Sequence, residues 1–179
     1  MILSRSHSRT GARRLLGALL ALSLIGLWVT ATAQDSASQI SLQSETYIVS
    51  VVTGDDGQPQ ERFSAATSAL PGQVVEFRIV ATNIDATTLP AGQVQIIGPV
   101  PDGMVYVAGS ATLGSDQVYT EFSVDGVEFV EQGQNVFVTE GGNRRIADPS
   151  EYRVVRWTLT TDMEPGQEVT LVYRVRLVD

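Results

Sequence analysis

The sequence predicts an all-β fold, an immunoglobulin-like antiparallel β-sandwich of seven to nine strands preceded by an N-terminal signal helix. Three observations lead to this prediction. Apolar and polar residues alternate with a period of two over several short segments. Gly, Pro and Asp separate these segments. After residue 33, no segment has the 3.6-residue apolar period of a helix.

The first 33 residues have the pattern of an export signal. Four arginines precede an apolar run at residues 15–29, and residues 31–33 (Ala-Thr-Ala) have the small side chains that signal peptidase accepts. We expect cleavage before Gln34. An uncleaved anchor is the alternative, because residues 15–34 carry no charge and could span a bilayer. In both cases the remaining chain is expected outside the cytoplasm, whether periplasmic, on the cell surface or secreted.

Residues 34–44 are mostly small and polar, so we expect a tether there, followed by one domain at residues 45–179. The first strand is expected at residues 47–52, which are largely β-branched and end at a Gly-Asp-Asp-Gly turn. The other expected strands are residues 74–80, 94–97, 104–107, 118–124, 127–130, 154–159 and 168–178. Residues 60–64 and 136–138 are candidates for a short partner strand and a short edge strand, respectively.

Turn residues predict how several of these strands connect. Asp125-Gly126 favours a type I′ hairpin with residues 127–130 as the return strand. Residues 131–149, rich in Gly, are expected to form a long exposed hairpin or loop. The Pro165-Gly166 turn predicts that the last two strands are antiparallel neighbours.

Trp157 is the expected centre of the core. It alternates with apolar neighbours in its strand, and we expect it to pack with Phe77 and Tyr173. No disulfide is possible in a chain without cysteine, so apolar packing alone must hold the two sheets together.

Composition excludes several kinds of chemistry. The chain has no cysteine and no lysine, and its one histidine is His7, within the expected signal. Residues 34–179 therefore have no thiol nucleophile, imidazole base or Schiff-base lysine, and no ligands for a zinc finger. Eight of the 12 arginines and all 20 acids follow residue 33, a formal charge of −12. A surface this acidic does not suit nucleic acid as a partner.

Four segments, in order along the chain, resemble motifs of one bacterial repeat family. They are residues 70–83 (LPGQVVEF, then ATN), residues 98–111 (GPVPDGMVYVAGSA), residues 122–126 (FSVDG), and residues 156–178 (RWTL, then MEPG to the final strand).

This order of motifs is similar to the DUF11 family of surface repeats. The resemblance implies an immunoglobulin-like or prealbumin-like sandwich on a bacterial envelope or secreted protein, without catalytic residues. The chain departs from the family at Pro99, where many members have an acid.

The acidic residues suggest two more specific functions, calcium binding and glycoside hydrolysis. Calcium could bind at loop ends, but no segment has EF-hand spacing, and Asp is also common in ordinary turns. Two carboxylates could hydrolyse a glycoside, but no sequence pattern marks two acids as buried partners. We expect no catalytic, metal or cofactor residues. The loop aspartates considered for calcium are Asp55, Asp56, Asp102, Asp125, Asp148 and Asp162.

Arg144-Arg145 is the basic pair of the acidic domain, and it could bind an anionic wall polymer. The simpler expectation is that it is solvated or pairs with Asp148 and Glu151. Exposed aromatic rings could also stack on sugars, although alternation assigns several of them to the core. The candidates are Tyr106, Tyr119, Phe122, Phe129 and Phe137.

These observations predict a non-enzymatic, exported β-sandwich module with a structural, adhesive or assembly role at the bacterial cell envelope. Its partner would be a protein or a cell-wall polymer, and it would contact the membrane only through an uncleaved N-terminal segment. The alternative is a module that binds carbohydrate or calcium, which requires an aromatic platform or clustered carboxylates. An acid-pair hydrolase is a third hypothesis.

Overall fold

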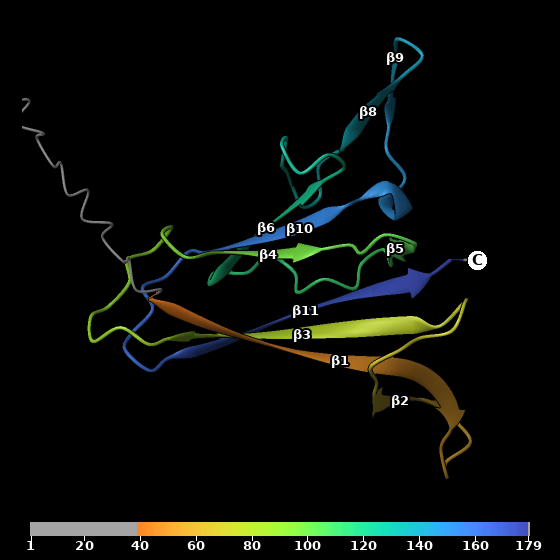
Figure 1. Ribbon diagram of the computed structural model, residues 1–179, viewed down its shortest axis with the longest axis horizontal. Coiled ribbons are helices and arrows are strands. Elements are labelled where there is room, and N and C mark those ends of the chain that lie inside the picture. Colours follow the sequence, from red (N-terminus) through yellow and green to blue (C-terminus); the bar gives the residue numbers. More distant parts are fainter. Residues whose placement is uncertain (1–38, 179) are drawn as a thin grey trace, which may run out of the picture. The chain divides into compact units, whose positions relative to one another are not determined.

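The computed structural model of the protein describes residues 39–178, which are built from antiparallel strands and one short 3-10 helix (Figure 1). The predicted all-β antiparallel sandwich is confirmed. The predicted signal at residues 1–33, with its helix, lies outside the described residues. The described part of the chain has no helix with the length and apolar character of a membrane span.

Two sheets form the layers of the sandwich. The large sheet has the order β2 (Pro59–Ala65), β1 (Ile40–Thr53), β3 (Val74–Asn83), β11 (Glu168–Leu177) and β5 (Met104–Tyr106). The small sheet has the order β4 (Gln95–Pro99), β10 (Val154–Leu159), β6 (Val118–Ser123) and β7 (Val130–Glu131).

A separate hairpin of two strands, β8 (Phe137–Glu140) and β9 (Asn143–Ile146), projects from the small-sheet side in Figure 1. The 3-10 helix η1 (Pro149–Glu151) follows it and leads into β10. This arrangement agrees with the long exposed hairpin expected over residues 131–149.

Strand β1 is longer than expected. It begins at Ile40, inside the segment expected to be a tether, and residues 40–49 pair with β3 along its whole length. Residues 34–38 of that expected tether lie outside the described residues. The small polar residues of 41–44 obscured this strand in the sequence, because its stability comes from hydrogen bonds to β3 rather than from its own apolar content.

Strands β10 and β11 are not neighbours, so the pairing predicted from Pro165-Gly166 is wrong. β10 pairs with β4 and β6 in the small sheet, whereas β11 pairs with β3 and β5 in the large sheet. The connection crosses from one sheet to the other past Met163, which is fully buried and bridges to Leu89. Alternation in a strand reveals its buried face but does not specify its partner strand.

The hairpin predicted at Asp125-Gly126 is wider than a type I′ turn. Its return strand is β7 (Val130–Glu131), which pairs with residues 121–122, and residues 127–129 are outside it. The Asp125 carboxylate accepts hydrogen bonds from the amides of Val127 and Glu128 at 2.8 and 3.0 Å. The side chain thereby satisfies backbone donors that a tight hairpin would have paired across the strands.

Trp157 lies at the centre of the core, as predicted, and is fully buried. Its ring centroid is 5.8 Å from that of Tyr173, which stacks on Phe77 at 5.1 Å. Both polar atoms find partners, since Trp157 Nε1 donates to Thr112 O at 3.1 Å and Tyr173 Oη donates to Pro99 O at 2.7 Å. Burial raises the pKa of Tyr173 to about 12.

Asn83, the last residue of β3, is almost fully buried at one end of the sandwich. Its side-chain amide donates to Met163 O at 2.8 Å and to Thr87 O at 3.0 Å, and its Oδ1 accepts from the amide of Asp85 at 2.9 Å. One side chain therefore joins the end of β3 to the loop that crosses between the sheets.

Replacing Gly98 is expected to destabilise the fold. An alanine Cβ there would lie 2.9 Å from ring atoms of both Trp157 and Tyr173, closer than packed atoms approach. We predict that Gly98→Ala lowers the free energy of unfolding by about 1–3 kcal/mol, measured by urea denaturation. Gly114→Ala is the control, since its nearest neighbour is 3.5 Å away. Equal stability of the two variants would contradict the close packing of β4 on the rings.

Candidate functional site

The loop aspartates considered for calcium are dispersed. Within residues 39–178, no three acidic or other metal-ligating side chains come together. Several of these aspartates accept hydrogen bonds from loop amides instead. Asp56 accepts from the amide of Gln58 in its own turn, and Asp162 accepts from the amide of Ala91 in another loop. Asp148 caps η1 by accepting from Ser150.

Two acids are buried, which the sequence pattern did not indicate. Glu76 lies on the outer face of the large sheet and Glu121 on the outer face of the small sheet. Both carboxylates are held by arginine: Glu76 pairs with Arg78 and Arg174, and Glu121 pairs with Arg156. Because they are on opposite outer faces, these carboxylates cannot flank one glycosidic bond as a hydrolase requires.

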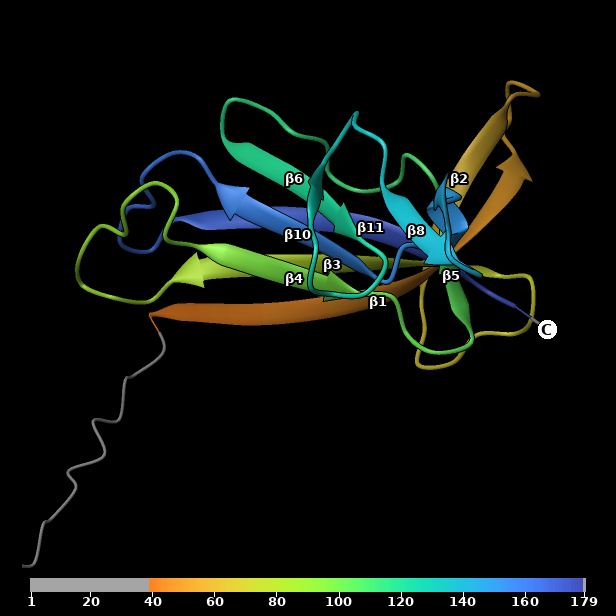
Figure 2. The ribbon, with the colours of Figure 1, turned by 90° about the horizontal axis from the view of Figure 1, so that it is seen from above.

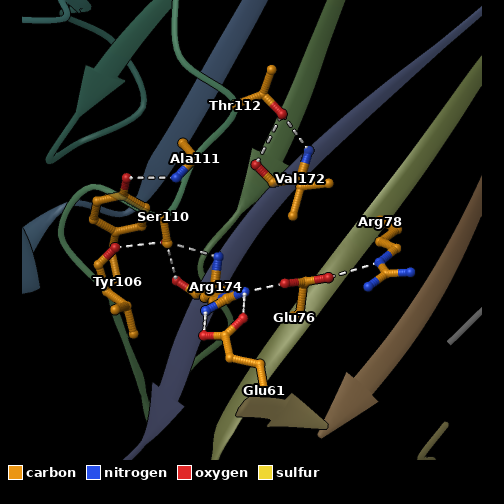
Figure 3. A network of polar contacts seen from close by, with 10 residues as sticks. Glu61, Glu76, Arg78, Tyr106, Ser110, Ala111, Thr112, Val172 and Arg174 are labelled. Carbon is orange, nitrogen blue, oxygen red and sulfur yellow. Dashed lines mark hydrogen bonds and ion pairs between the residues drawn. The ribbon is translucent and has the colours of Figure 1, made fainter. Parts of the chain in front are cut away.

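Glu76 is the centre of an ionic network on the outer face of the large sheet (Figure 3). It accepts from Arg78 Nε at 2.7 Å and from Arg174 Nε at 2.8 Å. The other two guanidinium nitrogens of Arg174 donate to the two oxygens of Glu61 at 2.7 Å each. This network ties the edge strand β2 to β11, across the two strands β1 and β3 that lie between them in the sheet.

Aromatic rings complete this layer. The guanidinium of Arg78 lies 4.5 Å from the ring centroid of Tyr47 and 4.7 Å from that of Phe63. The two rings meet edge to face at 6.5 Å. The planar arginine stacks on aromatic faces while its edge donates to carboxylates, so one side chain makes both contacts.

The small sheet repeats the arrangement in a simpler form. Arg156 donates to both oxygens of Glu121 at 2.7 and 2.8 Å, and its guanidinium lies 3.8 Å from the ring centroid of Phe129. These hydrogen bonds hold the pKa of the Arg156 guanidinium above its usual range. Phe129 is therefore covered and unavailable as a sugar platform.

Of the other aromatic candidates, Tyr106 and Phe122 are in the core, where both pack on Tyr152. Phe137 lies on the projecting hairpin beneath the guanidinium of Arg144, 3.9 Å from its ring centroid. Tyr119 has 37% of its surface exposed and lines a shallow cavity of about 510 Å³ beside Glu131. Phe137 is exposed to a similar degree, 40%, and lines a smaller cavity of about 110 Å³, but Arg144 covers one face of its ring. Tyr119 is therefore the candidate with the larger open cavity.

Arg144 and Arg145 both make local contacts, Arg144 with the ring of Phe137 and Arg145 with two carboxylates. Arg145 donates to both oxygens of Glu151 at 2.7 and 2.8 Å and also pairs with Glu140. The expected pairing with Glu151 is confirmed, whereas Asp148 instead caps η1. The Arg145 guanidinium lowers the pKa of Glu151 to about 2.

One flank of the sandwich stays open, between β1 and the edge strand β4. In Figure 2, β1 lies past β4, which is the last strand of the small sheet on that side. We call this flank the β1–β4 seam. Two open cavities, of about 430 and 320 Å³, lie along the inward side of β1 here. The second is between β1 and β4, where Leu42 and Ile96 contribute to it. The first is farther along β1, where Ile48, Phe77 and Met104 line it and no β4 residue does.

The seam differs in character from the two outer faces. None of the residues that line its two cavities is charged, although the chain carries 20 acids and 12 arginines. The polar residues among them are serine, threonine and glutamine. Sequence alternation placed Phe77 on a buried face, but it could not show that the cavity beside this residue stays open. Open, mostly apolar concavities are typical binding surfaces.

Comparison of the chain with protein-family models, with curated proteins and with solved structures returned no match.

Neutralising Glu76 is expected to destabilise the large sheet. Its side chain is 4% exposed and accepts from two arginines, so a Glu76→Gln change leaves their charge without a buried counter-ion. We predict a loss of about 2–4 kcal/mol in the free energy of unfolding, measured by urea denaturation.

Glu140→Gln is the matched control, since that carboxylate also meets an arginine but is 74% exposed. It should leave the urea midpoint close to that of the wild type. If both variants lose the same stability, the buried network is no more important than a surface ion pair.

The contact between Arg145 and Glu151 should respond to acid. The pKa of Glu151 in the folded chain is about 2, below its ordinary value of 4.5. The stabilising contact is therefore complete above pH 4.5 and is lost as the pH falls through about 2. An NMR titration of the Glu151 carboxyl carbon should give a midpoint near 2 in the wild type.

Arg145→Gln removes the donor and should move the Glu151 midpoint up toward its ordinary value. A wild-type midpoint already at that ordinary value would show that the bidentate contact does not form in solution.

Proposed function

We propose that this chain is an exported, non-enzymatic β-sandwich module with a structural, adhesive or assembly role at the bacterial cell envelope. It acts through its surface on a protein or a cell-wall polymer. The N-terminal pattern of arginines, apolar run and small residues supports export. The resemblance to DUF11-type surface repeats supports both the location and the absence of catalysis.

The β1–β4 seam is the observation that carries this proposal. Each outer face of the sandwich carries a cluster of arginine, carboxylate and aromatic side chains that satisfy one another. The seam is uncharged and concave, and it exposes apolar groups that gain free energy when a partner covers them.

The non-enzymatic part of the proposal is supported by the state of the buried acids. Glu76 and Glu121 each accept hydrogen bonds from arginine on an outer face of the sandwich, so these buried carboxylates are engaged within the protein rather than directed at a substrate. The chain after residue 33 also has no Cys, His or Lys to serve as nucleophile or base.

Carbohydrate binding is the second candidate, and the cavity beside Tyr119 favours it. An exposed ring next to Glu131 and Gln132 combines a stacking surface with hydrogen-bonding groups, which is the chemistry that a sugar requires.

Fractionation and cross-linking test the main proposal. We expect the full chain, carrying a C-terminal tag, to appear outside the cytoplasm with a new N-terminus at Gln34, as measured by mass spectrometry. Chemical cross-linking in intact cells should then join it to one envelope protein or wall polymer. Recovery of the intact chain from the cytoplasm, or no cross-linked partner, would contradict the proposal.

A thermal-shift series separates the two candidates. Wall polysaccharide or calcium should raise the melting temperature only if the chain binds it. For the carbohydrate candidate, Tyr119→Ala should abolish the shift, whereas Phe129→Ala, which removes a half-buried ring covered by Arg156, should retain it.

A further inference from the structure

We propose that the β1–β4 seam receives an extended strand from a partner protein, which pairs with β4 and lays apolar side chains into the two cavities. The inference rests on the proposed function, in which the chain acts through its surface, and it names the kind of partner and the mode of contact.

The backbone of β4 offers the hydrogen bonds for such a strand. Val94 O accepts from Leu159 N, and Val100 N donates to Arg153 O, so alternate residues from 94 to 100 face β10. The amide and carbonyl groups of Gln95 and Ile97 therefore point to the free edge. Among the described strands, only β10 pairs with β4.

The edge of β4 lacks the charged residues that commonly protect an edge against strand addition, although the strand ends at Pro99, which has no amide to donate. β2, the corresponding edge of the large sheet, contains Pro59, Glu61 and Arg62, and the edge strands β5 and β7 have only three and two residues. β4 contains no charged residue, and Ile97 is 54% exposed. An uncharged edge of five residues is long enough to template another strand.

Strand β1 of the large sheet lies beneath the free edge of β4 and would contact the inward side chains of an added strand. A strand added to β4 would lie about 4.8 Å from it and above the inward side of β1. Leu42, which is 56% exposed, and Ile48 lie on that inward side, one in each cavity. Along β1 the nearest inward residues of the two cavities are Leu42 and Thr46, which are four residues or about 13 Å apart, so inward side chains at the first and fifth positions of an added strand would enter them.

The lining of the cavities defines the chemistry of the partner strand. Two residues that line the cavities bond to charged side chains: Gln39 Nε2 donates to Asp85 at 2.7 Å, and Met104 O accepts from Arg153 at 3.5 Å. Neither Asp85 nor Arg153 lines a cavity. An ionised inward side chain would lose hydration without gaining a counter-ion, so the inward residues should be uncharged and apolar, such as Val, Ile or Leu.

A second copy of this chain does not supply such a strand from its described residues. The long free edge strand of the large sheet, β2, places Gln60, Arg62 and Ser64 on the side that would face the cavities. The inward residues of a second β4, Ile96 and Gly98, are already packed in their own core. The occupant is therefore a neutral segment of another protein, about five or six residues long, with apolar residues at every second position.

A synthetic strand tests this directly. The probe is an end-blocked peptide of alternating threonine and valine with one lysine at each end for solubility. We expect it to slow amide hydrogen exchange at Gln95 and Ile97 about tenfold at 90% occupancy, because only the free form exchanges there. It should also shift the methyl resonances of Ile48 and Met104. No protection at millimolar peptide, or protection at β2 or β5 instead, would overturn the inference.

Two variants and two controls make the result specific. Ile97→Pro removes one outward-facing amide without removing a bond to β10, and Thr46→Trp fills the first cavity without touching β4. Both should abolish binding, whereas Ile97→Thr, which retains the amide, should preserve it. A peptide with aspartate in place of valine should not bind. Binding that persists in both blocking variants would exclude the seam.

The cross-linking experiment separates this inference from the proposed function. If Ile97→Pro and Thr46→Trp retain the envelope partner of the wild type, strand addition is wrong while the proposed function stands. If the wild type has no partner, the proposed function itself fails. If the wild type self-associates in sedimentation and the two variants do not, the occupant is a second copy and the assignment to another protein is wrong.

Discussion

The contact of the Trp157 and Tyr173 rings with the backbone of Gly98 is the constraint on which the rest of the sandwich depends. Trp157 comes from the small sheet and Tyr173 from the large sheet, so their contact sets the spacing of the layers without any disulfide. Aromatic pairs of this kind contribute about 0.5–1.5 kcal/mol beyond the apolar area that they bury. Because Gly98 lies against both rings and Tyr173 donates to Pro99, the same contact holds β4 in position.

Because the small sheet ends at β4, part of the large sheet is left uncovered on that flank of the sandwich. β4 is the last strand of its sheet, while β1 and β2 continue the large sheet beyond β3. The layers are therefore unequal in width, and the inward side of β1 is left partly open. The two cavities and the free amides of β4 arise from this one mismatch, which explains why the backbone groups and the apolar groups lie on the same flank.

Arginine determines the character of the two outer faces. In a chain without lysine, guanidinium groups can lie over Tyr47, Phe63 and Phe129 while they donate to Glu76 and Glu121. A lysine ammonium could not make the bidentate contacts that hold Glu121 and Glu61. These layers neutralise the acids that would otherwise have suggested an active site, and they leave the seam as the uncharged concave surface.

Local pattern by itself determined the all-β class, the exclusion of disulfide and thiol chemistry, and the central place of Trp157, since each depends on residue type and on a period of two. It also predicted the contact between Arg145 and Glu151, which are close in sequence. Tertiary structure decided the rest: that β10 and β11 lie in different sheets, that β1 begins at Ile40, and that Glu76 and Glu121 are buried. It also decided that β4 ends its sheet before β1 is covered. Alternation reports only which side of a strand is buried, whereas strand partners and open edges depend on hydrogen bonds and packing between residues far apart in the chain.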